Sequence, residues 1–277
     1  MTDDAFKDLF GDDNSLNDFL KGFDTKGFRM PEVPDPKGNA LLMTFTREVI
    51  KGDKKYLERA VVEYKQEVYQ REENSSLLEA HAKAALFVGN LPLCCESLRK
   101  IKYPSIRHSQ AIGLVNYSQG NYGLAVKSFK AVKEDLSLPA RIAYSLSLLE
   151  LGFQEVKMHE EILKPALEKS SIANSILGYL YFNAQDTTSA EKYFWGAAKL
   201  NPNSERIRLD LMRIMDTNGK TPEIYAQMNS FYVDTNSRLT TEEITRQIKE
   251  RNLSVSRAPI KNLFKVIDSL LGQNEED

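Results

Sequence analysis

The sequence predicts an all-α protein, a right-handed α-solenoid of about five to six helix-turn-helix repeats with C-terminal capping helices. From residue 39 onward, apolar residues recur at helical spacing in segments that short turns interrupt. The turn positions Gly89, Gly120, Gly152, Gln185 and Gly219 are 31, 32, 33 and 34 residues apart. A period of this length is typical of a repeat made of two helices.

The first segment, residues 1–38, differs from the rest in composition. Up to Lys37 it contains nine acidic and five basic residues, and Pro31, Pro34 and Pro36 lie at its end. We interpret it as a disordered acidic tail followed by a stiff proline linker. Two apolar clusters in it have helical spacing and form candidate short binding motifs; a solvated tail with incidental aromatics is the alternative. The motif residues are Phe6, Leu9, Phe10, Phe19, Leu20 and Phe23.

The second segment, residues 39–235, contains the repeats. In one of them Leu177, Gly178, Tyr181, Ala190, Phe194, Ala197 and Pro202 follow one another at fixed offsets; in another Ile112, Gly113, Gly120, Tyr122, Ala125 and Phe129 do so. These two repeats resemble the tetratricopeptide family closely. The repeats around Gly89 and Gly152 resemble it less, because Ala82 and Ser145 replace the glycine that corresponds to Gly113. The resemblance covers roughly residues 75–232.

Each of these positions has a mechanical reason. A glycine at 113 or 178 lets the two helices of a pair approach closely, and the phenylalanine sixteen positions later fills the space beside it. Proline is tolerated only in the first turn of a helix or between helices. Pro92, Pro139 and Pro222 satisfy this rule, whereas Pro165 lies inside an expected helix, so we expect that helix to end or kink near Lys164.

The third segment, residues 236–277, predicts two helices that cap the last repeat. Thr240 and Glu243 form a capping-box pattern that starts a helix reaching about Asn252. Pro259 is expected to start the final helix, in which an apolar stripe should cover the open end of the solenoid. The stripe is Ile260, Leu263, Phe264, Ile267, Leu270 and Leu271.

Composition excludes several classes of function. The net charge is −2 in 277 residues, which gives no reason to expect a nucleic-acid partner. No run approaches the roughly 20 apolar residues of a membrane span, and the acidic start MTDDAFKDLF lacks the apolar region of a signal peptide. The two cysteines, Cys94 and Cys95, are adjacent and therefore poor disulfide partners, so a cytoplasmic, reducing compartment is expected.

No residue pattern indicates catalysis, and the sequence predicts neither an enzyme nor a cofactor or metal site. His81, His108 and His159 each stand alone, although zinc needs three or four ligands. Gly219–Lys220–Thr221 imitates the end of a phosphate-binding loop, but Ile214 stands where that loop needs glycine.

The tetratricopeptide resemblance implies a concave groove lined by the first helix of each pair, which binds peptide segments. It points to these groove residues: Lys83, Arg107, Gln110, Tyr117, Leu149, Tyr179, Phe182, Arg206 and Arg213. Glu79, Gln110, Ala143 and Ser175 stand at the positions with which some family members clamp chaperone tails, so that specificity is not expected here.

The sequence therefore predicts a non-enzymatic protein–protein interaction module that binds an apolar or amphipathic segment of another protein. The N-terminal tail is expected to be a second binding element or to occupy the groove itself. One alternative, by resemblance, is a chaperone or assembly factor of a bacterial secretion or pilus system. Another is a DNA-binding regulator that uses residues 240–271 as a helix-turn-helix. The oligomeric state stays open.

Overall fold

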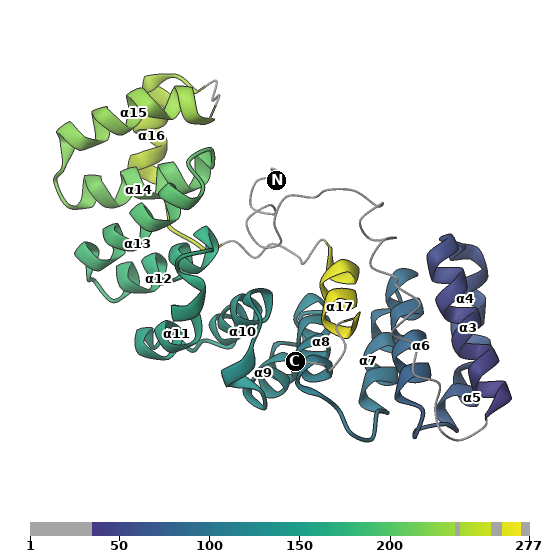
Figure 1. The fold of residues 1–277 in the computed structure, drawn as a ribbon. Coiled ribbons are helices and arrows are strands. Elements are labelled where there is room, and N and C mark those ends of the chain that lie inside the picture. Colours follow the sequence, from purple (N-terminus) through teal and green to yellow (C-terminus); the bar gives the residue numbers. More distant parts are fainter. Residues whose placement is uncertain (1–34, 236–238, 256–261, 273–277) are drawn as a thin grey trace. The chain divides into compact units, whose positions relative to one another are not determined.

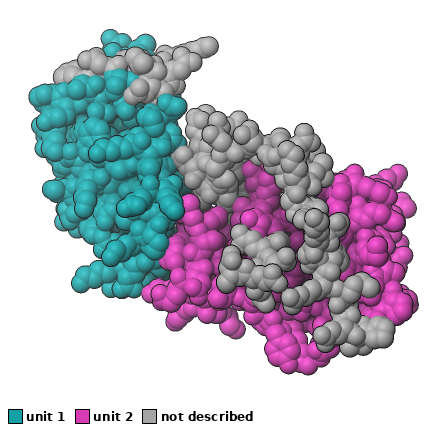
Figure 2. Space-filling model, in the orientation of Figure 1, with its two compact units in different colours: residues 1–12, 144–259 teal, residues 13–143, 260–277 magenta. Residues whose placement is uncertain are grey.

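The computed structural model describes residues 35–235, 239–255 and 262–272, and over these residues the regular structure is helical throughout (Figure 1). The predicted tail motifs between Phe6 and Phe23 lie outside the described residues. The chain divides into two compact units, which Figure 2 distinguishes by colour. The boundary falls between Ala143 and Tyr144, inside one helix, and the C-terminal part of the chain is shared between the units.

The unit formed by residues 13–143 and 260–277 contains the first repeats and the last helix. Helices α6 and α7 pack against each other, as do α8 and α9, and α3 packs on α6. The helices of this unit are α3 (Pro36–Lys51), α4 (Lys54–Glu63), α5 (Lys65–Tyr69), α6 (Ser75–Phe87), α7 (Leu91–Arg99), α8 (Ile106–Ser118), α9 (Tyr122–Lys130), the 3-10 turn η2 (Lys133–Asp135), the start of α10 (Leu138–Glu150) and α17 (Leu263–Gly272).

The unit formed by residues 1–12 and 144–259 contains the later repeats. Helices α12 and α13 form its most extensive pair, α13 packs on α14, and α14 packs on α15 and α16. Its helices are the rest of α10, α11 (Val156–Leu163), the 3-10 turn η3 (Lys164–Ala166), α12 (Ser171–Asn183), α13 (Thr187–Leu200), α14 (Glu205–Thr217), α15 (Thr221–Thr235) and α16 (Thr241–Glu250).

The predicted repeat turns share one backbone conformation. Gly89, Gly120, Gly152, Gln185 and Gly219 all have positive φ, between 64° and 85°. Gly52, where the sequence also predicts a turn inside a helix pair, adopts the same conformation at 73°. The equal spacing seen in the sequence thus corresponds to equivalent left-handed turns, each ending the first helix of a pair.

The close approach expected at the two glycines is confirmed. A Cβ atom on Gly113 would lie 2.4 Å from Cε1 of Phe129, and a Cβ on Gly178 would lie 2.8 Å from Cδ2 of Phe194. Both rings are buried. Each glycine therefore provides the space that the phenylalanine of the facing helix fills.

Helix boundaries follow the capping residues. Helix α11 ends at Leu163 and Pro165 lies in the 3-10 turn that follows, as predicted. The capping box of Thr240 and Glu243 is formed and starts α16. The boundary at residue 38 was placed three residues too late: Pro36 is not linker but begins α3, because Asp35 caps that helix by accepting a hydrogen bond from the N–H of Gly38 at 3.0 Å.

The two C-terminal helices have different roles. Helix α16 packs on α14, where a cap was expected, and Ile244 and Ile248 are buried there. Helix α17 instead packs on α6 and α8 of the first repeats, so its predicted role as a cap of the last repeat was wrong. Helices α16 and α17 belong to different compact units, and DNA binding through residues 240–271 stays a prediction.

Candidate partner-binding surface

The surface formed by α6 and α8 holds a helix of the same chain. Helix α17 lies against both helices, as the labels in Figure 1 show. Lys83 Nζ of α6 lies 3.2 Å from Asp268 Oδ1 of α17, and only 18% of each side chain is exposed. One turn further along α6, the ring of Phe87 meets Phe264 edge to face, with 5.5 Å between ring centroids. The predicted groove residue Lys83 thus binds a carboxylate on an amphipathic helix.

The sequence of α17 explains why it binds here. Leu263 and Ile267 are buried, and they lie on one side of the helix because they are four positions apart. Phe264 and Asp268 are also four positions apart and present an aromatic ring and a carboxylate together. Burial of a side chain such as Ile267 contributes about 1.5–3 kcal/mol. Apolar contact therefore supplies most of the affinity, and the partly buried ion pair fixes the register.

A second element of the C-terminal segment lies on a predicted groove residue of the other unit. The guanidinium of Arg206 on α14 donates to the carbonyl of Ser254. Arg251 Nε donates to Asp210 Oδ1 at 2.5 Å. Asp210 is almost fully buried, which raises its pKa, while Arg251 and Arg206 act against that shift. Arg251 and Ser254, which follow α16, thus both contact α14.

Three predicted groove residues have structural roles. Gln110 is buried: its Nε2 donates to the carbonyl of Asp135 at 3.0 Å, and its Oε1 accepts from the N–H of Ser137 at 2.9 Å, so it fixes the connection into α10. Tyr117 is buried beside Tyr122, with 5.9 Å between ring centroids. Phe182 packs against the apolar core of α13, α14 and α15. Gln110 and Tyr117 are therefore buried, whereas Phe182 remains partly exposed.

The side chains of the other predicted groove residues remain partly exposed to solvent. Arg107, Leu149 and Tyr179 are all half-buried. Arg213 forms an ion pair with Asp216 one turn away, at 3.2 Å. Among the predicted residues, Lys83 and Arg206 both contact the C-terminal segment.

The occupant of this surface was missed because the stripe of α17 had been assigned to a cap. Its sequence offered one signal against that assignment. Asp268 stands between Ile267 and Leu270, inside the apolar run, where a helix covering an apolar end would place no charge. A carboxylate there requires a cationic partner, and Lys83 is that partner.

The buried histidines have structural partners. His81 Nε2 donates to the carbonyl of Val61 at 2.8 Å, and its Nδ1 lies 2.8 Å from Ser97 Oγ. His159 repeats this arrangement with the carbonyl of Phe153 and with Ser145 Oγ. Burial lowers the pKa of both imidazoles. Within the described residues, no group of three or more His, Cys, Asp or Glu side chains could hold a metal ion.

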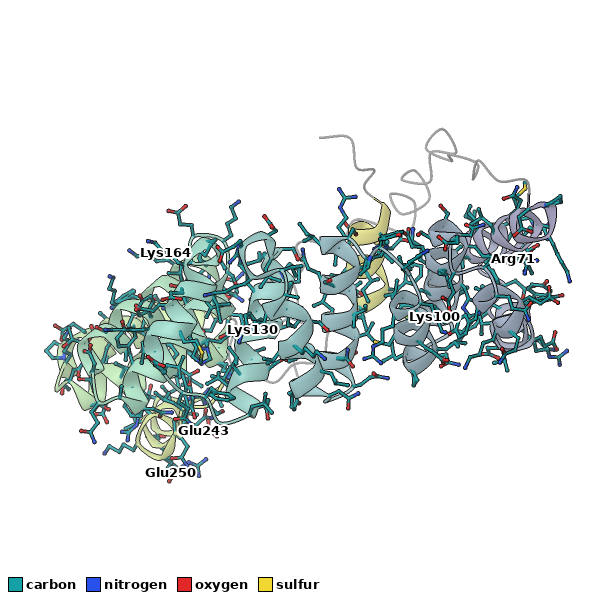
Figure 3. All side chains as sticks on the ribbon, turned by 90° about the horizontal axis from the view of Figure 1, so that it is seen from below. Arg71, Lys100, Lys130, Lys164, Glu243 and Glu250 are labelled. Atoms are coloured by element: carbon teal, nitrogen blue, oxygen red, sulfur yellow. The ribbon has the colours of Figure 1, made fainter. Side chains whose placement is uncertain are left out.

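The remaining hollows are shallow. One lies over the outer face of α16, with Glu242, Arg246 and Lys249 among its lining residues. The side chains of Glu243 and Glu250 project from the same helix (Figure 3). Mixed charges on a surface helix of this kind are typical of a solvated face.

The comparisons with known proteins add a distant likeness. No protein-family model matches the chain, and no curated protein does. A solved structure of a MamA mutant is similar at 13% identity and a TM-score of 0.46, covering 57% of this chain and 97% of that one. None of the described helices is long and apolar enough to cross a membrane.

Proposed function

We propose that this chain is a non-enzymatic protein-interaction module whose α6/α8 surface binds an amphipathic helix of a partner protein. The position of α17 supports this proposal, because α17 presents three features to the surface: a buried aliphatic side chain, an aromatic ring against Phe87 and a carboxylate beside Lys83. A partner helix with the same features would replace α17. Helix-in-groove binding of this type depends on a few anchors spaced three or four residues apart.

The partner would therefore be recognised by shape and charge, without a covalent step. Cys94 and Cys95 are buried free thiols whose pKa values are raised by burial, so they are poor nucleophiles. The same free thiols support a cytoplasmic location as part of this proposal.

The N-terminal tail is proposed as a second binding element, which either inhibits binding of the partner or recruits a separate protein. In the first case, deletion of residues 1–30 should raise the affinity for the partner.

Affinity capture with the full chain tests the proposal. The substitution Asp268→Lys places like charges at Lys83 and should detach α17, so the amount of captured partner should rise. The double variant Lys83→Glu with Asp268→Lys restores an ion pair for α17 but rejects an acidic partner helix, so the same protein should be lost. The identity of the captured protein would also show whether the partner is a secretion-system cargo or a component of another assembly.

The matched control is Lys130→Glu, because Lys130 is an exposed lysine on α9, away from the α6/α8 surface. It should leave capture unchanged. Equal capture by wild type, the Asp268→Lys variant and the double variant would show that this surface does not bind the partner.

A further inference from the structure

Residues 260–268, which include the first six residues of α17, and the second apolar cluster of the N-terminal tail have the same sequence pattern. Residues 16–24 read LNDFLKGFD and residues 260–268 read IKNLFKVID. Four apolar positions coincide when the two segments are aligned, at the spacing of one helix face. A lysine and an aspartate coincide as well, at Lys21 with Lys265 and at Asp24 with Asp268.

The coinciding positions are those that bind α17 to the repeats. Phe264 meets Phe87, Ile267 is fully buried, and Asp268 pairs with Lys83. The tail residues at these places are Leu20, Phe23 and Asp24. An apolar stripe alone would be a generic match. An acid placed directly after its fourth apolar residue is the specific part, since the ion pair with Lys83 depends on it.

We propose that residues 16–24 of the N-terminal tail are a second ligand for the α6/α8 surface and compete there with α17. In this arrangement Leu20 takes the place of Phe264, Phe23 that of Ile267, and Asp24 pairs with Lys83. The inference rests on the proposed binding function of this surface and names its occupant. Both ligands are tethered to the same chain, so each has a high effective concentration and a small difference in affinity decides which one is bound.

The tail ligand is the weaker helix former of the two. Gly22 stands where α17 has Val266, and glycine is less favourable than valine in a helix by roughly a few tenths of a kcal/mol. The α17 helix is therefore the occupant at rest, and the tail binds when α17 leaves.

The first apolar cluster of the tail provides a natural control. Aligned with Phe264, residues Phe6 and Leu9 supply the two apolar anchors, but Phe10 stands where Asp24 and Asp268 supply the acid. A peptide of residues 3–12 thus has similar composition without the charge that pairs with Lys83.

The probe is a fluorescent peptide of residues 14–27. The protein is the full chain with the substitutions Ile267→Asp and Phe23→Asp, which remove the central apolar anchor of α17 and of the tail. Anisotropy should show saturable binding to this variant, at least tenfold tighter than to the wild-type chain. The peptide with Asp24→Lys should bind at least tenfold more weakly, and adding Lys83→Glu to the protein should restore its binding. The peptide with Gly22→Ala should bind more tightly than the parent.

Each other outcome overturns the inference. Absence of binding to the variant, equal binding of the 3–12 peptide, or indifference to the charge exchange would show that the tail does not use this surface. If Ile267→Asp unfolds the repeats, as judged by circular dichroism and thermal unfolding, then α17 is a fixed part of the core and no ligand exchanges with it. Partner capture dependent on Lys83 could still occur in all these cases, so failure here leaves the proposed function separately testable.

Discussion

At the scale of single residues, Gln185 shows how the repeat overrides local preference. It has a φ of 64° at the turn where the other repeats have glycine, and it is the one non-glycine residue with positive φ among those described. Side chains with a Cβ atom pay roughly 1–2 kcal/mol for this conformation. The turn position was predictable from spacing alone, because the period of the repeat identified it where composition did not.

Replacing Gln185 by glycine should therefore stabilise the protein by up to about 1 kcal/mol, the gain being reduced by the larger entropy of glycine in the unfolded chain. Chemical denaturation of the full chain measures this difference. The matched control, Gln185→Ala, retains the Cβ atom and should change stability little. A stabilisation of equal size by alanine would mean that the side chain, and not the backbone, is responsible.

Gln110 marks the opposite limit at this scale. The resemblance to known repeats put it in the groove, while the structure uses both ends of its amide to hold the backbone of Asp135 and Ser137. A sequence pattern gives the face of a helix, but it does not tell which polar side chain on that face reaches the next repeat.

At the scale of elements, two repeats fill the space between their paired helices with different residues of similar combined size. Gly113 faces Phe129. At the same register in the preceding repeat stand Ala82 and Leu98, both fully buried. A larger residue on the first helix thus accompanies a smaller one on the second. In the repeat around Gly89 the packing thus tolerates alanine in place of the glycine, because the facing residue is smaller. The repeat around Gly152 differs: there Ser145 Oγ lies 2.8 Å from His159 Nδ1.

Gly113→Ala should accordingly destabilise the protein by about 1–3 kcal/mol, since its Cβ would meet the ring of Phe129. Adding Phe129→Leu recreates the Ala82/Leu98 combination and should recover part of the loss. Thermal or urea unfolding of the single and double variants gives the coupling energy.

The control for this cycle is Gly123→Ala in α9, where an added Cβ has nothing within 4 Å. It should be neutral or stabilising by about 0.4–1 kcal/mol. Strictly additive effects of the Gly113 and Phe129 substitutions would show that the two positions do not share one space.

At the scale of the whole molecule, the sequence predicted the helical class and the repeat register, because both follow from periodic burial. It did not predict where α17 binds. The apolar stripe of that helix was visible, but any uncovered apolar surface of the repeats could have received it. Local pattern thus determines what each helix buries, while the choice among several receiving surfaces depends on tertiary contacts such as Lys83 with Asp268.

Each unit also contains one buried neutral histidine, His81 or His159, and this sets how stability depends on pH. Burial lowers both pKa values below the ordinary 6.5. Between that value and the folded pKa, the unfolded chain binds more protons than the folded one, so stability falls as pH falls through this window. The melting temperature should be constant above about pH 7 and drop as the pH falls below about 6.5. His159→Gln should flatten the drop; an unchanged profile would assign it to other groups.

The seating of α17 also has a consequence in time. Lys83 is synthesised well before Asp268, which follows 185 positions later. The α6/α8 surface is complete once α8 has ended at Ser118. At translation rates of about 5–20 residues per second, it then stays uncovered for roughly 8–30 s until Asp268 has been made. During that interval the N-terminal tail is already present and α17 is not. A nascent chain thus passes through a state with an open surface, and a partner encountered then meets no resident helix to displace.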